Sequence, residues 1–305
     1  MTIEPALLQL RERFATLPPP VIVYNKSHSG SRLLARALIE QGIFMGAERN
    51  ESEDALPLQA VVEAAVTAYY PAFGRLWEAP GAEPAVLAAL VRDAFDRHLA
   101  GYRPQAGRGW GWKLCEALYA MPLFDFLFPR ARVLHLIRDG RDVAWCNHVA
   151  PEQAFWRKVY FNTDRVRSWQ GRSLSNAAYE RRPHLYNALH WRNSVETGRA
   201  FGAMLRERYC EIRYEDLCAD FVATMTALLH RLGLEPDAPA IAAMAAGVRL
   251  DSIGKHRGQP WPARRAVQRL IEPTLLSFGY GERPLRAPVD RAAPLKAWLQ
   301  GRMRV

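Results

Sequence analysis

Three groups of basic residues lie where the chain turns, and their spacing suits the binding of an anion. The first runs from Lys26 to Arg32 and also contains a histidine, three serines and a glycine. The other two are Lys113, after a tryptophan-rich stretch, and Arg138, directly after an apolar run. Only five of the 41 basic residues are lysine, and three of these five lie in loops or strand ends of this kind: Lys26, Lys113 and Lys255. Because a compact ammonium group is a common phosphate ligand, these positions predict a phosphate or sulfate site.

The segment around the first group has the pattern of a strand, a tight loop and a helix. An apolar, β-branched run over 21–24 is typical of a buried strand. After a small, polar turn, apolar residues recur at helical spacing: Leu33, Leu34, Ala37 and Leu38. This order leaves backbone N–H groups free at a helix N-terminus, which is a ready anion site. The loop is no Walker A motif, because Gly30 is followed by Ser31 and Arg32, so we predict a phosphate cradle not built for Mg-ATP.

Further strands are predicted at 112–115, 132–137 and 210–214, and helices separate them. The helical segments are 5–17, 57–100 with a break near Pro80, 123–128, 221–232 and 262–276. Strands that alternate with helices favour an α/β fold of three layers, in which helices flank a central parallel β-sheet. In open parallel sheets, ligands bind at the carboxyl ends of the strands. The cradle, Lys113 and Arg138 all lie at predicted strand ends, so we expect them at one edge of the sheet.

Composition limits the classes of function. The chain has 305 residues and 49% hydrophobic content, enough for a full core, and no stretch between 20 and 280 is typical of a linker. We therefore expect one domain. Its net charge of +10 predicts a general attraction for anions, but the arginines are scattered, so no specific nucleic-acid partner is expected. The four cysteines form no CxxC pair and have no ordered spacing with histidine, which predicts reduced thiols and no metal site.

The N-terminus and the hydropathy pattern indicate where the protein works. Residues 1–5 carry an acid where a signal peptide has a basic region and an apolar core. No apolar run approaches the roughly 18 residues of a membrane span. We therefore expect a cytoplasmic protein without a membrane span.

Three segments together carry a resemblance to a known family. They are 27–34, with the sequence SHSGSRLL, 128–144, with FPRARVLHLIRDGRDVA, and 212–217, with IRYEDL. Their order and spacing resemble the sulfotransferases that use 3′-phosphoadenosine-5′-phosphosulfate (PAPS), over roughly residues 20–280. The resemblance is closer to the carbohydrate and tyrosylprotein branches and to bacterial relatives than to the small-phenol enzymes. It implies a single sulfotransferase domain over 1–305, with a P-loop-like phosphosulfate-binding loop, helical acceptor-side insertions near 43–110 and 150–190, and a C-terminal tail at 281–305.

The resemblance implies a set of cofactor-binding residues. The loop would bind the 5′-phosphosulfate through its backbone N–H groups and its side chains, and the set is Lys26, Ser27, His28, Ser29, Gly30, Ser31 and Arg32. Arg138 would bind the 3′-phosphate, together with the residue eight positions on, which is a serine in the family and Cys146 here. A thiol is a weaker hydrogen-bond donor than a hydroxyl. The late basic loop would close over the cofactor with Ser252, Lys255 and Arg257.

The resemblance also implies catalytic roles. Lys113 resembles the lysine that steadies the bridging oxygen as the sulfuryl group leaves, and His28 takes the place of a basic residue that touches this group. The reaction is an in-line displacement in which positioning and cationic stabilisation dominate, so no metal is expected. A general base must take the proton of the acceptor hydroxyl, and Glu48 matches the glutamate of the tyrosylprotein-like branch. Asp54 and Glu53, from the same acid-rich stretch, are its rivals.

We predict a PAPS-dependent sulfotransferase that acts on an acceptor hydroxyl, on a glycan or on another small or macromolecular alcohol. Two alternatives stay open. A P-loop kinase-like phosphotransferase would need lysine after Gly30 and a metal-binding aspartate after a strand, whereas Arg138 comes before Asp139. A non-catalytic nucleotide-binding homologue is favoured by the residues that depart from the family pattern, Cys146 and His28.

Several other residues with reactive or polar side chains are expected to be structural. His135 lies in the middle of an apolar strand, and Trp110 and Trp112 suit core packing better than ligand stacking. The turn at Glu215 and Asp216 is expected to anchor loops by accepting backbone N–H bonds.

Overall fold

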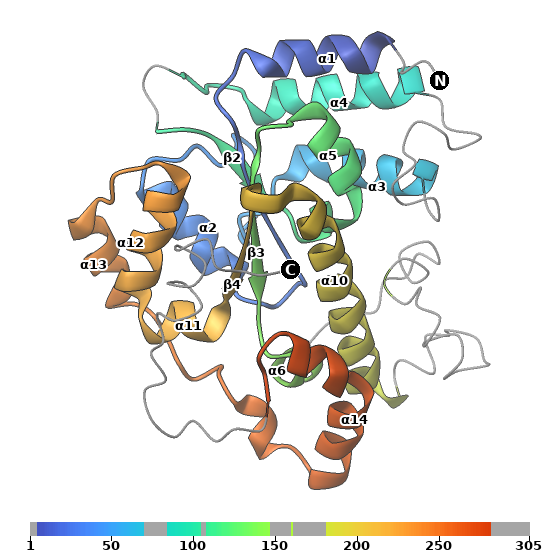
Figure 1. The fold of residues 1–305 in the computed structure, drawn as a ribbon, viewed down its shortest axis with the longest axis vertical. Coiled ribbons are helices and arrows are strands. Elements are labelled where there is room, and N and C mark those ends of the chain that lie inside the picture. Colours follow the sequence, from blue (N-terminus) through green and yellow to red (C-terminus); the bar gives the residue numbers. More distant parts are fainter. Residues whose placement is uncertain (1–4, 70–83, 105–107, 147–159, 161–180, 282–305) are drawn as a thin grey trace.

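The structure is a computed structural model that describes residues 5–69, 84–104, 108–146, 160 and 181–281 (Figure 1). Its centre is a four-stranded sheet in which all strands are parallel, in the order β2-β1-β3-β4. The strands are β1 (Val21–Asn25), β2 (Gly111–Lys113), β3 (Arg132–Ile137) and β4 (Tyr209–Arg213). They confirm the predicted parallel sheet, with strand bounds close to the predicted ones.

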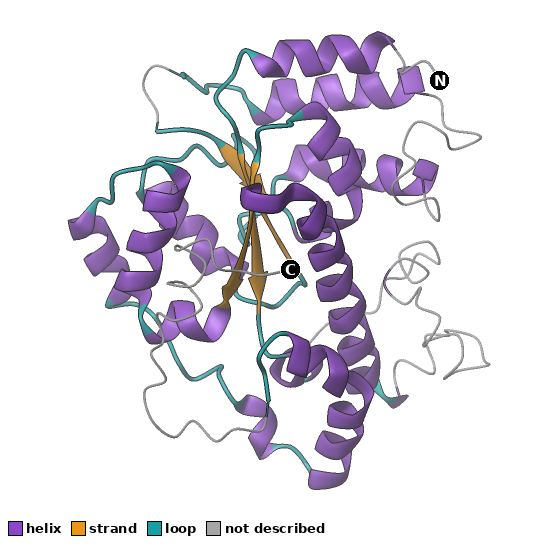
Figure 2. Cartoon of the chain, viewed as in Figure 1, coloured by secondary structure: helices purple, strands orange, loops and turns teal. Residues whose placement is uncertain are grey.

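Both faces of the sheet are covered, because its central strand is apolar along nearly its whole length. Every residue of β1 is buried. Ile22 and Tyr24 face one core, and Val21 and Val23 face another, as the two-residue period of a strand requires. A parallel strand that is buried on both sides needs helices on both sides. Figure 2 shows this arrangement, with the strands between two groups of helices.

One face is covered by α2 (Ser31–Glu40), α11 (Tyr214–Ala219), α12 (Phe221–Leu232) and α13 (Ala238–Ala245). The other is covered by α1 (Pro5–Ala15), α3 (Leu56–Tyr69), α4 (Pro84–His98), the 3-10 helix η1 (Cys115–Ala120), α5 (Met121–Leu127) and α10 (Pro183–Leu205). Beyond the carboxyl ends of the strands, α6 (Gly140–Ala144) and α14 (Trp261–Ser277) pack with α10. Two short 3-10 segments are η2 (Arg206–Arg208) and η3 (Lys255–Gly258).

The helices predicted within the described residues are confirmed. The helix α12 has the predicted bounds and ends at Gly233, whose φ of +74° is the left-handed conformation of a C-terminal cap. The segment predicted as one interrupted helix over 57–100 contains α3 and α4. The pattern did not predict η1 or α13, which have six and eight residues and are too short to show a clear helical period.

The tryptophans and the histidine that the sequence assigns to the core do lie there. Trp110 and Trp112 are fully buried and pack around Phe95, at ring-centroid distances of 6.2 and 5.5 Å. His135 is also fully buried, and its Nδ1 lies 2.7 Å from the Tyr209 hydroxyl. Burial lowers the pKa of His135 to about 3, so its ring is neutral. These contacts confirm the structural role of the three residues.

Parts of the predicted domain map lie outside the described residues. This applies to most of the segment 150–190 and to nearly all of the tail 281–305. The acceptor-side role of 43–110 and 150–190 stays a prediction, and so does the single domain. Within the described part of the chain, no helix is long and apolar enough to cross a membrane.

Candidate active site

The carboxyl ends of β1, β2 and β3 bring the cradle, Lys113 and Arg138 to one edge of the sheet. The cradle joins β1 to α2, which begins at the buried Ser31, and Gly30 caps this helix with a φ of +87°. A Cβ atom at Gly30 would lie 2.2 Å from the Tyr214 ring, so only glycine fits both the space and the backbone. The N–H group of Leu33 donates to the backbone oxygen of Gly30 at 3.0 Å, whereas those of Ser31 and Arg32, at the start of the helix, can donate to an anion.

Two buried polar groups at this edge have no hydrogen-bond partner among the described residues. They are the hydroxyl of Ser29 and Nε of Arg138. Lys26 is also buried, and its ammonium group donates to the backbone oxygen and the hydroxyl of Ser27, at 3.1 and 2.8 Å. Burial lowers the pKa of Lys26 to about 8. Buried donors without acceptors are unfavourable, so these groups suit an anionic ligand.

The side chain of His28 lies within the electrostatic influence of four cations from separate segments of the chain. Burial lowers the pKa of this histidine, and the positive charges of Lys26, Lys255, Arg138 and Lys113 lower it further, to about 4. The imidazole ring is therefore neutral at pH 7. An anion bound among these cations would raise the pKa of His28 again.

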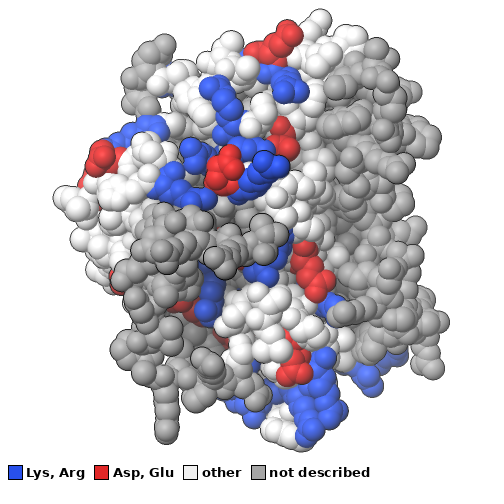
Figure 3. All heavy atoms as spheres, in the orientation of Figure 1, with Lys and Arg blue, Asp and Glu red and all other residues white. Residues whose placement is uncertain are grey.

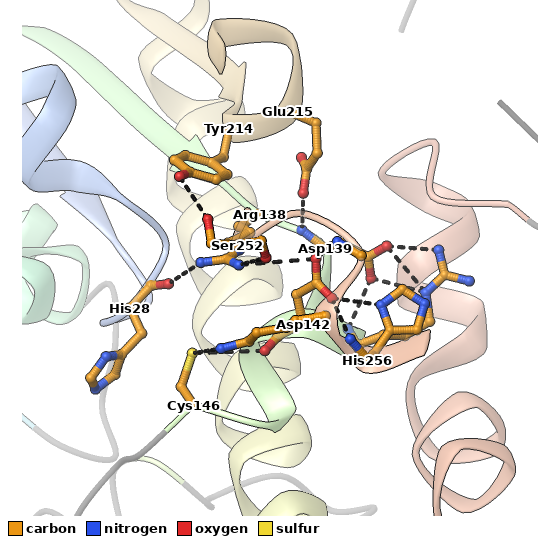
Figure 4. A network of polar contacts seen from close by, with 12 residues as sticks. His28, Arg138, Asp139, Asp142, Cys146, Tyr214, Glu215, Ser252 and His256 are labelled. Atoms are coloured by element: carbon orange, nitrogen blue, oxygen red, sulfur yellow. Dashed lines mark hydrogen bonds and ion pairs between the residues drawn. The ribbon is translucent and has the colours of Figure 1, made fainter. Parts of the chain in front are cut away.

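Arg138 follows β3 and reaches two other loops (Figure 4). Its guanidinium group donates to the backbone oxygen of His28, at 3.3 Å, and to that of Ser252. It also lies over the Tyr214 ring, with 4.9 Å between Cζ and the ring centroid. The backbone oxygen of Arg138 accepts a hydrogen bond of 2.9 Å from the indole of Trp191. The close hydrogen bonds of the Arg138 side chain are thus made to neutral groups, and its one carboxylate neighbour, that of Asp142, lies 4.0 Å away at the limit of an ion pair.

Asp142, on α6, anchors the late basic loop, as Figure 4 shows. Its buried carboxylate accepts from the backbone N–H of Gly254 at 2.6 Å and from that of His256 at 3.0 Å, and it lies 2.6 Å from the His256 ring. Burial alone would raise the pKa of Asp142, but the hydrogen bonds from His256 and Gly254 keep it below its ordinary value. Sequence reasoning missed Asp142, because the contact joins distant segments.

The late loop brings Lys255 to Cys146, where the resemblance places the 3′-phosphate. The ammonium group of Lys255 donates to the Cys146 sulfur at 3.1 Å. The Ser252 hydroxyl lies 3.1 Å from a tyrosine hydroxyl of α11. Two further predicted residues are exposed: Arg32 in the first turn of α2 and Arg257 in η3. The structure therefore gathers the predicted cofactor residues around one edge, with these two arginines facing solvent.

The three acids that compete for the role of general base have different partners. Asp54 forms an ion pair with Lys113, with 2.6 Å between Oδ1 and Nζ. Glu48 binds Arg97 through both carboxylate oxygens, with 42% of its side chain exposed. These hydrogen bonds hold the pKa of Glu48 below its ordinary value. Glu53 pairs with two other arginines. Asp54 is thus the acid that the fold brings to Lys113, and the catalytic role of Glu48 stays a prediction.

Glu116 is a further carboxyl at this end of the site, and sequence reasoning missed it. It lies three residues after Lys113, on η1, and accepts a hydrogen bond of 3.1 Å from the Tyr160 hydroxyl. Burial raises the pKa of Glu116, and the negative charge of Asp54 raises it further. Its position just beyond the carboxyl end of β2 was the one signal for it in the sequence.

Glu215 has the predicted structural role, but it and Asp216 lie in the first turn of the helix α11 and not in an open turn. The carboxylate of Glu215 accepts from the backbone N–H of Asp139 at 2.9 Å and from the Tyr280 hydroxyl at 2.8 Å. It thereby ties the turn after β3 to the first turn of α11. Among the described residues, no three His, Cys, Asp or Glu side chains are grouped so that they could hold a metal ion.

A model of the sulfotransferase family matches residues 28–238 of this sequence. The chain belongs to the sulfotransferase family. The region matched by the family begins within the cradle and includes Lys113, Arg138 and Cys146. The late loop with Lys255 follows that region. No match was found among curated proteins.

Several solved structures are similar to this chain, among them two sulfotransferase domains. The sulfotransferase domain of the Synechococcus PCC 7002 olefin synthase has 18% identity and a TM-score of 0.51, over 87% of this chain and 96% of that one. The sulfotransferase domain from the curacin biosynthetic pathway has 15% identity and a TM-score of 0.48, over 87% and 99%. Retinol dehydratase, solved with retinol and PAP (adenosine 3′,5′-bisphosphate), has 13% identity and a TM-score of 0.40, over 93% of this chain and 88% of that one. The likeness to the olefin synthase domain shows a shared fold.

Proposed function

We propose that this member of the sulfotransferase family moves a sulfuryl group from PAPS to the hydroxyl group of an acceptor by in-line displacement. The observation that carries the proposal is that Lys26, Lys113 and Arg138 lie at the carboxyl ends of adjacent parallel strands, where contacts to Arg138 and Cys146 bring the late loop with Lys255. Buried donors without partners among the described residues lie at the same edge of the sheet. PAPS carries anionic groups at its 3′ and 5′ positions, and this edge offers cations from separate loops to each of them.

The residues present fit this cofactor. The hydroxyl of Ser29 and the N–H groups at the start of α2 are donors for the 5′-phosphosulfate, beside Lys26. Arg138 and Lys255 are cations for the 3′-phosphate. When bound, the cofactor supplies the sulfuryl group and a nucleotide leaving group. Asp142 holds the loop that carries Lys255, so it is a positioning residue.

Lys113 is our candidate for the cation that steadies the leaving oxygen. Its side chain is only 3% exposed, so its charge acts in a region of low dielectric constant. Burial alone would lower the pKa of Lys113, but Cys115 and Asp54 raise it above the ordinary value, so the ammonium group is charged at pH 7. A buried cation held by a carboxylate is oriented before the reaction begins, and it requires little rearrangement to stabilise negative charge.

Asp54 is our candidate for the general base, ahead of Glu48. A base must lie within hydrogen-bond reach of the proton that it takes, close to the reacting group. Asp54 is paired with Lys113, whereas Glu48 is held by Arg97 at the surface. When Lys113 turns to an anionic ligand, the carboxylate of Asp54 is released to take the proton of the acceptor hydroxyl. Glu116 is the second candidate, because it follows Lys113 by three residues and burial raises the pKa of its carboxyl, which makes the carboxylate a stronger base.

The acceptor in this proposal is an alcohol, which is either a glycan or another hydroxyl-bearing molecule. A carboxylate beside a buried cation suits a neutral nucleophile that must lose a proton as it attacks. The loop that carries Asp54 belongs to the segment 43–110, which we assign to the acceptor side of the site.

Release of adenosine 3′,5′-bisphosphate (PAP) from PAPS, measured with a panel of hydroxyl-bearing acceptors, tests the proposed function. We expect release that depends on the acceptor, with a kcat that falls about 10²- to 10³-fold in Lys113→Ala. Arg92→Ala is the matched control, because it removes an exposed cation of α4 and should leave the rate unchanged. Acceptor-dependent release that is equal in Lys113→Ala and in the control would contradict the role of Lys113. No release with any acceptor would contradict the proposed function.

A further inference from the structure

A second cationic cavity lies between α6 and the N-terminal half of α14. It has a volume of about 510 Å³ and is lined mainly by arginine and tryptophan: Arg141, Trp145, Trp261, Arg264, Arg265 and Arg269. We call it the α6–α14 groove. Figure 3 shows Lys and Arg gathered at the lower end of the molecule, where Figure 1 places α14. None of the residues that line the groove belongs to the predicted cofactor-binding set, although Trp145 and His256 are the sequence neighbours of Cys146 and Lys255. Figure 4 shows His256 and His28 on opposite sides of Asp142.

The groove has an excess of positive charge. Its described lining contains four arginines and one carboxylate, that of Glu272, which already accepts from Gln268 at 3.1 Å. Arg141 is paired with Asp139 at 2.7 Å. The other three arginines form no ion pair within the described residues: Arg264, Arg265 and Arg269. Arg265 and Arg269 lie one turn apart on α14, where like charges repel. A bound anion would relieve this repulsion.

Two tryptophans accompany the arginines. Trp261 is 58% exposed, which is unusual for so large an apolar side chain, and the Arg265 guanidinium lies 5.0 Å from its ring centroid. Trp145 stacks on His184 at 4.6 Å, and its Nε1 is buried without a hydrogen-bond partner among the described residues. Nε of Arg264 is likewise buried without a hydrogen-bond partner among the described residues. Unused buried donors beside flat apolar faces are features of a ligand site.

We propose that the α6–α14 groove is a second anion-binding site, which takes a ligand with two or more oxyanion groups attached to a ring. The oxyanions are sulfate, phosphate or carboxylate, because guanidinium groups bind all three in a bidentate manner. The ring contacts Trp261 and Trp145. The volume of the groove lies in the range of small-molecule sites. The proposal does not rest on PAPS as the cofactor, because the groove is lined by residues outside the predicted cofactor-binding set. Two of them, Arg265 and Arg269, are exposed on α14 and line the groove.

Calorimetric titration of the full chain with two probes tests this site. One probe is a heparin-derived tetrasaccharide, which carries sulfate and carboxylate groups on rings. The other is tripolyphosphate, which carries the charge without a ring. The double variant Arg265→Glu/Arg269→Glu reverses two groove charges at exposed positions. The matched control, Arg92→Glu/Arg103→Glu, makes the same change of net charge elsewhere. Arg138→Ala removes the central cation of the cofactor site.

We expect saturable binding of the tetrasaccharide to the wild-type chain, and weaker binding of tripolyphosphate. The affinity for the tetrasaccharide should fall about tenfold or more in the groove variant and change less than about twofold in the control and in Arg138→Ala. Equal losses of affinity in the groove variant and the control would overturn the proposal, because they would show that the tetrasaccharide is attracted by the net positive charge of the chain and not by the groove. Loss in Arg138→Ala would place the probe in the cofactor site. Absence of saturable binding, or tripolyphosphate as the tighter ligand, would also overturn it.

Discussion

The two ends of the cofactor site hold their cations in different ways. At the β2 end, Lys113 is paired with a carboxylate, since its Nζ lies 2.6 Å from Asp54. At the β3 end, Arg138 donates to backbone oxygens, and the carboxylate of Asp142 lies 4.0 Å away and is occupied by the late loop. The first end therefore holds a neutral pair before any ligand binds. The second end keeps a positive charge.

From this difference we predict which end of the proposed site binds the cofactor and which end takes part in the reaction. A cation whose carboxylate neighbour is 4.0 Å away and is held by the late loop gains more from an anionic ligand than a closely paired cation does, so we expect the end at Arg138 to contribute mainly to affinity. A paired cation gains less, but its carboxylate can accept a proton once the pair opens, so the end at Lys113 contributes mainly to the reaction. Substitutions at the β2 end should therefore lower kcat, and substitutions at the β3 end should weaken cofactor binding.

The largest effect is expected when Asp54 loses its charge. Asp54→Asn should lower kcat about 10²- to 10⁴-fold, because an amide cannot take the proton of the acceptor. Its effect on the Kd of PAP should be small. Glu48→Gln is the matched control, since it removes another ion-paired carboxylate from the same loop, and it should keep nearly the full rate. Steady-state kinetics of the two variants at saturating PAPS decide whether Asp54 or Glu48 is the general base. A large loss in Glu48→Gln with a small one in Asp54→Asn would move the base to Glu48.

A smaller effect, on binding, is expected at Asp142. The amide of Asp142→Asn replaces one acceptor by a donor that opposes the N–H groups of Gly254 and His256, so the late loop should loosen. The Kd of PAP should rise about tenfold, while kcat at saturation changes less than about threefold. His256→Gln keeps the backbone contact and should have a weaker effect of the same kind. A fall in kcat without a change in Kd would contradict the assignment of binding to this end.

The charge state of His28 should report the arrival of an anion. Its pKa is about 4 in the free protein, and a nearby negative charge raises it. Binding of PAP should therefore take up protons between about pH 4 and pH 7, and the affinity should increase as the pH falls through this window. Calorimetry at about pH 5.5, in two buffers of different ionisation enthalpy, measures this uptake. His28→Gln should abolish most of it. Equal uptake in the variant would assign the proton to another group.

The smallest effect is expected at Cys146. A serine hydroxyl is a better hydrogen-bond donor than a thiol, and Lys255 already contacts this position at 3.1 Å. Cys146→Ser should therefore improve the affinity for PAP about two- to tenfold, without changing kcat. Weaker binding of PAP would mean that the site is adapted to the sulfur atom.

The pattern of apolar residues predicted the elements that position the site. The strands at 21–25 and 132–137 and the helix that ends at Gly233 follow from it, because burial on one or two faces leaves a regular spacing in the sequence. The turn that leads from β1 into α2 follows from the small polar residues before Gly30. The local sequence pattern was therefore sufficient to predict these strands, this helix and this turn.

Spacing could not predict which side chains meet. The choice between Glu48 and Asp54 depends on a turn in which Oδ1 of Asn50 accepts from the backbone N–H groups of Ser52 and Asp54. Asp142 meets the late loop only through tertiary packing. Glu116 follows Lys113 closely in the sequence, but its raised pKa depends on burial, which no local pattern reveals.

Calorimetric titration with PAP, for the wild-type chain and for Arg138→Ala, tests whether this edge of the sheet binds the cofactor. We expect saturable binding of PAP without a metal ion, weakened about tenfold or more in Arg138→Ala, and weak binding of ATP with Mg²⁺. Tighter binding of ATP with Mg²⁺ than of PAP would favour a phosphotransferase. Binding of neither nucleotide would contradict the cofactor site and favour a non-catalytic member of the family.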